Sequence, residues 1–224
     1  MAILRKSTRR RFGKFITWLI ILGAAFGIVS YRLVDKIGLE KRPEDRFRVI
    51  KVLDGDTVEL TGGDKVRLLA LDTPEHGEQY FEQARQMLQK LAQGKSVRLE
   101  YGSARRDKYG RMLGYVFVDD TVLANRMLID SGLGYLYLFQ DNDLDGPYVR
   151  EMLNAQRSAI NRKVGLWSVQ RHVEDHYVTT ARSFRLHRPN CDAVKDLGPG
   201  QGRIFKTREE GLAEGLSPCR ECKP

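Results

Sequence analysis

The sequence predicts a mostly β domain with helices packed against it, and three observations support this prediction. Short runs rich in β-branched and other apolar residues alternate with glycine-containing turns in residues 47–71. Later segments place apolar residues three and four positions apart, which is typical of amphipathic helices. Apolar residues also make up 42% of the 224-residue chain, enough for a globular core in one or two domains.

The first expected strands cover residues 47–53, 57–60 and 65–71. Glycine-containing pairs at 54–55 and 62–63 separate them, and both pairs are hairpin signals. These three runs therefore predict an antiparallel meander.

The elements that follow are both helical and extended. An amphipathic helix is expected over residues 79–92, after which the strand pattern resumes over residues 97–101 and 112–118. Two more helices are expected, over residues 123–131 and 149–160.

The basic N-terminus weakens any argument from net charge. Residues 1–14 contain six lysines and arginines and no acid, so they contribute +6 to the formal net charge of +9. The remaining excess is small, and charge alone is weak evidence for binding to a polynucleotide.

Residues 15–31 form an uncharged stretch that is expected to anchor the chain in a lipid bilayer. As a helix it would be about 26 Å long, against about 30 Å for a hydrocarbon core. The positive-inside rule then predicts the N-terminus in the cytosol and the chain after Arg32 outside, at the cell surface or in the periplasm. The alternative is a cleaved signal peptide and secretion, because Gly23 and Ala25 are small residues at cleavage-like spacing.

Three short polar clusters run through the predicted β domain, at residues 54–57, 67–75 and 107–111. Carboxylates at the ends of strands can hold a hard divalent cation and orient a water. Arginines can bind a phosphate bidentately and stabilise charge as it develops. The clusters therefore predict a phosphodiesterase.

These clusters, in this order, resemble the motifs of the staphylococcal nuclease family, and the similarity covers residues 46–168. The resemblance implies an OB-like fold, a five-stranded Greek-key barrel with packed helices. It also implies a calcium-dependent endonuclease that acts on DNA, RNA or both. The alternative is a non-catalytic OB-fold module that binds nucleic acid at the cell surface.

The resemblance assigns the metal site and the base. It implies a calcium site formed by Asp56, Asp72 and the backbone carbonyl of Thr73, and oxygen-only ligation agrees with a hard ion. Glu75 matches the position that orients or deprotonates the attacking water, although an acid there could also start a helix. Asp54 is the expected turn former or a partner of these ligands.

The resemblance also assigns residues that contact the substrate. Arg67 and Arg111 match the two arginines that contact the scissile phosphate, where planar guanidinium forks suit the developing charge. Lys108 and Tyr109 match positions that bind a terminal phosphate of the substrate.

One departure from the family concerns the tyrosine that usually faces the nucleotide. The simplest ungapped register puts Leu138 at that position. Tyr135 and Tyr137 lie close by in the sequence and are expected to stack on a base instead.

The last residues contain all three cysteines of the chain. His187, Cys191, Cys219 and Cys222 offer four ligands for tetrahedral zinc. Residues 184–224 resemble the small zinc-binding domain of Ada-type DNA alkylation-repair proteins, but a histidine stands at the methyl-acceptor cysteine, so methyl transfer is not implied. The alternative is a disulfide such as Cys191 to Cys219 with one free thiol.

The expected organisation has six parts. They are a basic N-terminus (1–14), an anchor (15–31), a linker (32–45), a nuclease-like domain (46–168), a second linker (169–183) and a zinc-binding-like unit (184–224). A capping box at Thr207 and Glu210 predicts a helix in the last unit. No catalytic candidate lies beyond Arg111, so hydrolysis is expected not to require this unit. The sequence indicates no protein partner.

Overall fold

The computed structural model describes residues 46–139, 147–181, 183–198 and 200–224. All of them belong to one compact unit, which begins at Asp45 and includes the C-terminus. The predicted basic N-terminus, anchor and first linker lie outside the described residues.

The predicted membrane location requires correction. Among the described residues, no helix is both long and apolar enough to cross a bilayer. The longest of these helices, α4 (Pro147–Arg162), has 16 residues and carries charged side chains along its length, which a hydrocarbon core disfavours. The predicted span at residues 15–31 lies outside the described ranges. We therefore withdraw both the membrane location and the contact with lipid.

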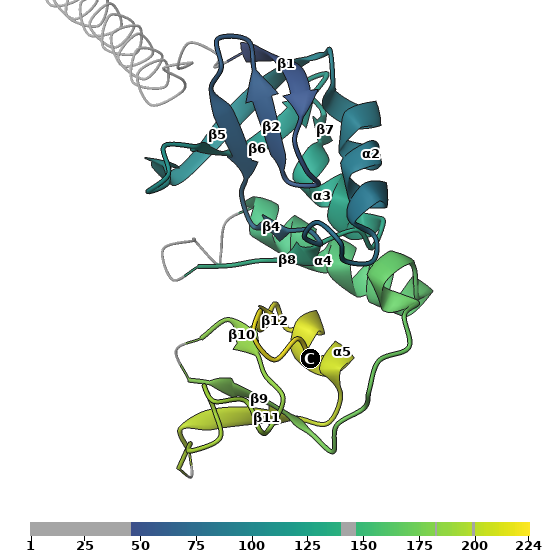
Figure 1. Cartoon of the computed structure of the whole chain (residues 1–224), viewed down its shortest axis with the longest axis vertical. Coiled ribbons are helices and arrows are strands. Elements are labelled where there is room, and N and C mark those ends of the chain that lie inside the picture. Colours follow the sequence, from purple (N-terminus) through teal and green to yellow (C-terminus); the bar gives the residue numbers. More distant parts are fainter. Residues whose placement is uncertain (1–45, 140–146, 182, 199) are drawn as a thin grey trace, which may run out of the picture. The chain divides into compact units, whose positions relative to one another are not determined.

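Five strands close into a barrel, which confirms the predicted OB-like fold (Figure 1). Antiparallel pairing joins β1 to β2, β2 to β3, β1 to β5 and β5 to β6. Parallel pairing of β3 with β6 closes the sheet. The barrel strands are β1 (Arg46–Val52), β2 (Thr57–Leu60), β3 (Lys65–Leu68), β5 (Ser96–Arg106) and β6 (Met112–Val118).

Two helices and a short edge strand complete this part of the fold. Strand β7 (Val122–Leu123) pairs with β6 and leads directly into α3 (Ala124–Asp130). Helix α2 (Phe81–Ala92) buries Ala84, Leu88 and Ala92, which recur every four residues along one face. It begins two residues later than the sequence predicts, because Tyr80 adopts a left-handed backbone with φ of 71°.

The expected strand over residues 65–71 is broken into two. Strand β3 ends at Leu68, and Ala70 has a left-handed backbone with φ of 54°. The chain then enters β4 (Leu71–Asp72), which pairs with β8 (Tyr135–Leu136) outside the barrel sheet.

A buried asparagine stabilises this break. The Asn125 side chain donates to the Leu69 carbonyl at 2.8 Å and accepts from the Val116 amide at 2.9 Å. It therefore provides hydrogen bonds for backbone groups at the break, from a helix 56 positions away in sequence.

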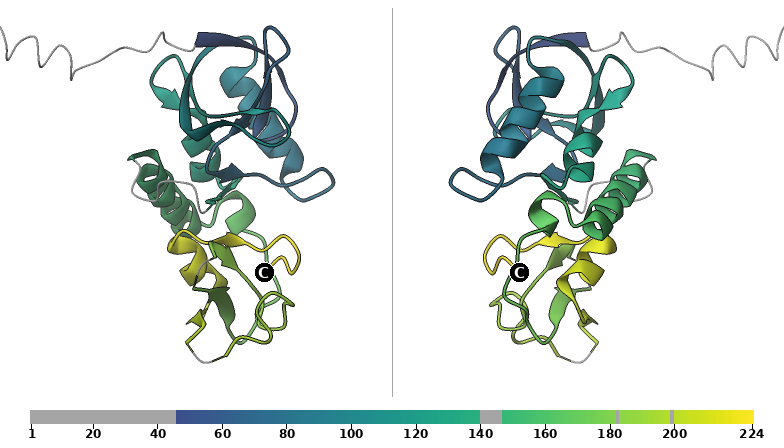
Figure 2. Two further views of the ribbon diagram at one scale, coloured as in Figure 1. Left: turned by 90° about the vertical axis from the view of Figure 1, so that its left-hand side faces the viewer. Right: turned by 90° about the vertical axis from the view of Figure 1, so that its right-hand side faces the viewer.

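The C-terminal part consists of short elements, of which the helices η1 and α5 pack against α4 (Figure 2). Strands β9 and β11 form an antiparallel pair, and β10 and β12 form a parallel pair. The elements are η1 (Gly165–Trp167), β9 (Tyr177–Thr180), β10 (Arg185–Leu186), β11 (Gly202–Phe205), α5 (Arg208–Ala213) and β12 (Ser217–Pro218).

Buried hydrogen bonds of α4 join this C-terminal part to strand β8. Gln156 of α4 accepts from the Leu136 amide at 2.7 Å and donates to the Leu212 carbonyl at 2.6 Å. The predicted capping box is confirmed, since the Thr207 hydroxyl accepts from the Glu210 amide at 3.1 Å. The residues after 168 therefore pack on the preceding part of the chain, although their sequence motifs differ from those before it.

Candidate functional site

Two of the predicted metal ligands meet at one rim of the barrel. Asp56 precedes β2 and Asp72 ends β4. Both carboxylates face one guanidinium, because Arg67 Nη2 lies 3.1 Å from Asp56 Oδ2 and 3.3 Å from Asp72 Oδ1. The three side chains are only 11–16% exposed, so the shared guanidinium balances charge that is largely removed from water.

A tight turn positions Asp56. Its amide donates to Asp54 Oδ1 at 3.0 Å, as expected for a turn former. Asp56 Oδ2 in turn accepts from both the amide and the hydroxyl of Thr73, each at 3.1 Å. A Cβ on Gly55 would lie 2.6 Å from the Thr73 hydroxyl, so glycine allows the two segments to approach this closely.

Negative charge is concentrated in this part of the molecule. Burial and the neighbouring Asp56 carboxylate raise the pKa of Asp54 to about 6. Burial also raises the pKa of Asp72, although Arg220 and Arg67 act in the opposite direction. The rim is therefore an environment that favours a bound cation.

Backbone carbonyls at the strand break orient Arg67. Its Nη1 donates to the carbonyls of Leu68 at 2.9 Å and Leu71 at 2.7 Å. The carbonyls exposed by the strand break thus provide the hydrogen-bond acceptors that an arginine in this otherwise apolar run requires. The same irregularity that turns the chain toward Asp72 also aims the guanidinium between the two carboxylates.

Glu75 lies beyond β4 and is 76% exposed. Its amide donates to the Glu78 carboxylate at 2.9 Å, and helix α2 begins only at Phe81. The side chain is therefore not that of a helix-start acid, and it lies at the edge of the pocket formed by the acidic rim.

The loop before β6 holds Arg111. Asp107 accepts from the Arg111 amide and Nε at 2.9 and 2.8 Å, and from the Tyr109 amide at 2.9 Å. Burial acts to raise the pKa of Asp107, but these hydrogen bonds outweigh it and hold the pKa below its usual range. Tyr109 is 74% exposed, with Lys108 Nζ 5.1 Å from its ring centroid.

One pocket of about 140 Å³ contains most of these groups. We call it the site pocket. Its lining residues are Asp54, Asp56, Arg67, Thr73, Pro74, Glu75, Arg111 and Arg220. An adjoining cleft of about 650 Å³ shares Thr73, Pro74, Glu75 and Arg220 with it and continues along the C-terminal part.

Sequence reasoning missed Arg220. Its Nη2 lies 2.6 Å from Asp72 Oδ1 and 4.0 Å from Glu75 Oε1. The only available signal was an arginine between the two cysteines of a Cys-x-x-Cys pair, and that position does not by itself indicate a role in hydrolysis.

The two predicted stacking tyrosines differ in accessibility. Tyr137 is 8% exposed, and the Arg185 guanidinium lies 3.7 Å from its ring centroid. Tyr135 lines the larger cleft, and its hydroxyl accepts from Arg208 at 3.0 Å. Burial makes Tyr137 poorly placed for stacking, whereas Tyr135 lies where a base could reach it. Leu138 is a core residue.

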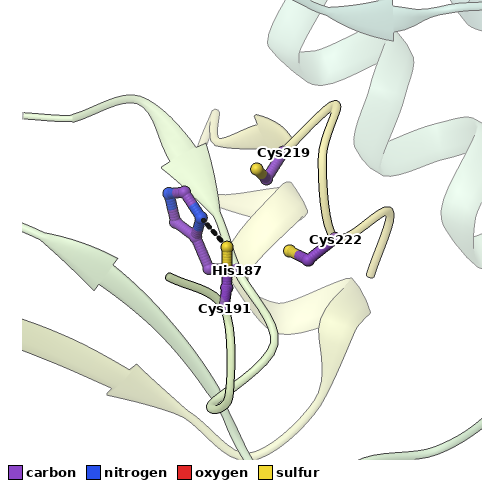
Figure 3. A group of neighbouring side chains, drawn as sticks. All are labelled: His187, Cys191, Cys219 and Cys222. Carbon is purple, nitrogen blue, oxygen red and sulfur yellow. Dashed lines mark hydrogen bonds between the residues drawn. The ribbon is translucent and has the colours of Figure 1, made fainter. Parts of the chain in front are cut away.

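The four predicted zinc ligands converge in the C-terminal part (Figure 3). One ligand atom from each of His187, Cys191, Cys219 and Cys222 can be chosen so that all four lie within 4.8 Å of one another. The three cysteines are free thiols rather than disulfide partners. Burial and the neighbouring thiols raise the pKa of Cys222 to about 12, and burial lowers that of His187. A neutral imidazole beside crowded thiols matches a Cys₃His metal site.

Comparisons with known proteins agree with this geometry. The model of the staphylococcal nuclease homologue family matches residues 65–169. An uncharacterized endonuclease of Escherichia coli O157:H7 is 36% identical over 124 residues, which cover 54% of this chain and 76% of the relative. A thermonuclease of Staphylococcus hyicus is 29% identical over 170 residues, which cover 69% of this chain and 98% of the relative. A micrococcal nuclease of Shigella flexneri is 28% identical over 156 residues, which cover 65% of this chain and 86% of the relative.

Proposed function

This chain belongs to the staphylococcal nuclease family, and on that premise we propose that it is a calcium-dependent endonuclease that hydrolyses phosphodiester bonds of DNA, RNA or both. That it is a nuclease follows from the family and its named relatives. One observation carries the finer proposal. A buried carboxylate, a partly buried one, an exposed one and two guanidiniums from separate elements line or border one small pocket.

The donor set supports calcium. Asp56, Asp72 and the Thr73 carbonyl would hold the ion through oxygen atoms alone, as a hard cation prefers. The convergence of both carboxylates on Arg67 indicates that the rim requires a positive charge between them. Bound there, calcium would supply charge that polarises a water and the substrate phosphate.

The chain's own residues would carry the remaining steps. Glu75 is exposed at the pocket edge and would accept a proton from the attacking water. Arg67 and Arg111 would donate hydrogen bonds to the non-bridging phosphate oxygens as negative charge builds up on them. The Asp107 carboxylate orients Arg111 for this purpose through its Nε.

Surrounding residues would bind the rest of the substrate. Lys108 and Tyr109, on the exposed loop beside Arg111, would contact a terminal phosphate. We propose Tyr135 and Tyr137 as the stacking side chains, with the accessible Tyr135 as the stronger candidate. A purely nucleic-acid-binding module would use such arginines and aromatics but would not need Glu75 beside an acid pair.

We also propose that the His/Cys cluster, formed by His187, Cys191, Cys219 and Cys222, binds one zinc ion. The proximity of its four ligand atoms supports tetrahedral ligation, and the free thiols favour zinc over the disulfide alternative. The structural role of such an ion would be to cross-link two segments with little core of their own.

Circular single-stranded DNA tests the proposed activity, because a molecule without ends can be opened only by internal cleavage. The purified full chain should linearise it with calcium, stop when a calcium chelator is added, and recover with excess calcium but not with added zinc. A parallel assay on single-stranded RNA reports the substrate class. Cleavage that persists in chelator would contradict calcium dependence, and trimming of linear DNA alone would contradict endonucleolytic action.

A further inference from the structure

A residue from the C-terminal part reaches the site pocket. Arg220 comes from the turn between Cys219 and Cys222, 148 positions after Asp72. Its guanidinium donates to Asp72 Oδ1 at 2.6 Å and lines the same pocket as Arg67 and Arg111. The pocket therefore contains three guanidiniums, two from the barrel and one from outside it.

We propose that Arg220 is a third substrate-binding arginine of the nuclease site and that the His/Cys cluster is the device that positions it. The proposed ligand is the phosphodiester backbone of a single-stranded nucleic acid at the reacting phosphate. This inference rests on the proposed function.

The turn that carries Arg220 is held from both sides. The Cys219 amide donates to the Leu186 carbonyl at 2.9 Å, and the Lys223 amide donates to the Cys219 carbonyl at 3.0 Å. Cys222 Sγ accepts from the Arg188 amide at 3.3 Å. Since Arg220 lies between two of the proposed zinc ligands, Cys219 directly before it and Cys222 two residues after it, an ion in the cluster would fix the backbone on both sides of it.

The pairing with Asp72 resembles that of Arg67. Both guanidiniums lie against the same carboxylate oxygen, Asp72 Oδ1. When this carboxylate serves a cation, both guanidiniums lose this shared acceptor, and the substrate phosphate is the anion that then enters the pocket. Arg220 is 57% exposed, so it is free to turn from the carboxylate to a phosphate. An ion pair as exposed as this one contributes little to the free energy of unfolding, so stability alone does not account for Arg220 at this place.

The neighbouring cleft offers further cations beside the site pocket. Its lining includes the basic side chains Arg171, Arg188 and Lys223 as well as Arg220. Arg188 pairs with Glu174 at 2.8 Å, and Lys223 Nζ pairs with Glu78 at 2.5 Å. Exposed cations next to the reacting phosphate would contact neighbouring phosphates of a polynucleotide.

The contrary interpretation is that Arg220 inhibits the enzyme by occupying Asp72 in place of the cation. The two interpretations predict opposite effects. A substrate-binding arginine weakens substrate binding when it is removed, whereas an inhibitory arginine leaves binding intact and raises the rate when it is removed.

Two measurements on the full chain with calcium distinguish these outcomes. The first is the affinity of a fluorescent single-stranded oligonucleotide for the inactive background Glu75→Gln, measured by anisotropy. Adding Arg220→Ala should weaken binding about tenfold or more, as expected for a charge-assisted hydrogen bond. Arg220→Lys should recover part of the loss. Glu221→Gln, an exposed change in the same turn, serves as the matched control and should leave binding unchanged.

The second measurement is steady-state cleavage with Glu75 intact. Arg220→Ala should raise KM by a similar factor, and its zinc content should equal that of the wild type. Cys222→Ser should lose zinc and reproduce the effect of Arg220→Ala, and combining both changes should add little. Additive losses in the double variant would contradict positioning by the cluster.

The outcomes separate this inference from the proposed function. An inactive wild-type chain would contradict the proposed activity, while the binding measurement would still decide the role of Arg220. An active wild type whose Arg220→Ala variant binds and cleaves like Glu221→Gln would overturn the inference alone. Faster cleavage with unchanged binding would overturn it in favour of inhibition.

Discussion

The barrel rim and the C-terminal part both border the site pocket, but different forces hold them in shape. The barrel packs around a continuous cluster of 24 buried apolar residues. The His/Cys cluster has a local core of only three buried residues, of which two are its own cysteines. The rest of the C-terminal part has a second core of seven buried residues, among them Leu186 and Leu212. Burial of apolar area can therefore position the rim, whereas the turn of Arg220 has little apolar core next to it, and the proposed ion would supply the missing constraint.

Hydrogen bonding differs in the same way between the two regions. On the rim, Asp56 and Arg67 are each held by several short bonds to backbone or hydroxyl groups. Around Arg220, the Cys219 amide and carbonyl make two backbone hydrogen bonds, and the Cys222 sulfur accepts from the Arg188 amide. The comparison leads us to expect that the rim, which packs on a core, tolerates small changes, whereas loss of one ligand of the proposed zinc site displaces the whole turn of Arg220.

The largest effect is expected from the barrel side of the site. Glu75→Gln keeps the size of the side chain but removes the base, so kcat should fall by about 10² or more. Arg111→Ala should lower the rate by a similar amount through loss of charge stabilisation. The measurement is single-turnover cleavage of single-stranded DNA at saturating calcium.

Matched surface variants test whether these losses are specific. Glu82→Gln removes an exposed carboxylate that pairs with Arg85 on α2, and Arg106→Ala removes an exposed arginine that pairs with Asp64. Both should retain the wild-type rate. If either control lost as much activity as its partner variant, the assignment of Glu75 or Arg111 would be wrong.

An intermediate effect is expected from the metal cluster. His187→Ala should abolish zinc binding and increase hydrogen exchange around residues 187–191 and 219–222, because the core next to the cluster has only three buried residues. The barrel should keep its protection from exchange. Zinc content by elemental analysis and exchange by mass spectrometry are the measurements.

A second histidine provides the control for this prediction. His172 has a side chain that is 73% exposed and lies outside the cluster, so His172→Ala should keep one zinc per chain. A wild-type chain that contains no zinc, or unchanged exchange in His187→Ala, would mean that packing alone shapes this region.

The smallest effect is expected from the cap of α5. Thr207→Ala removes the hydroxyl that accepts from the Glu210 amide, which should cost about 1 kcal/mol of unfolding free energy. Chemical denaturation measures this loss, and KM should stay unchanged because the cap does not border the site pocket. Thr121→Ala, which removes an exposed turn hydroxyl on the barrel, should cost less. Equal losses would show that the cap adds nothing specific.

Local patterns were sufficient for most elements of the barrel. Strand β6 spans Met112–Val118, the same residues that alternation and apolar content predict, and α2 differs from the prediction only at its first turn. These features depend on residues that are close together in the chain, so a short segment of sequence is enough to predict them. The capping box at Thr207 was predictable for the same reason.

Strand β5 shows where local reasoning failed. It continues to Arg106 rather than ending at residue 101, and the pairing with β6 shifts register between Tyr101 and Arg106. Glycine and charged residues in this stretch have low strand propensity, and pairing with β6 resumes only at Arg106, which lies opposite Met112. Propensity does not describe such a distant pairing.

The types of residue needed for hydrolysis were determined locally, since carboxylates, arginines and their order along the chain are sequence properties. Their convergence was decided by tertiary structure. Asn125 stabilises the break that turns the chain toward Asp72, and the turn of Arg220 brings a guanidinium to a carboxylate 148 positions away. No short window contains both partners of such a contact, because the free energy that fixes it comes from the packing of segments that are distant in sequence.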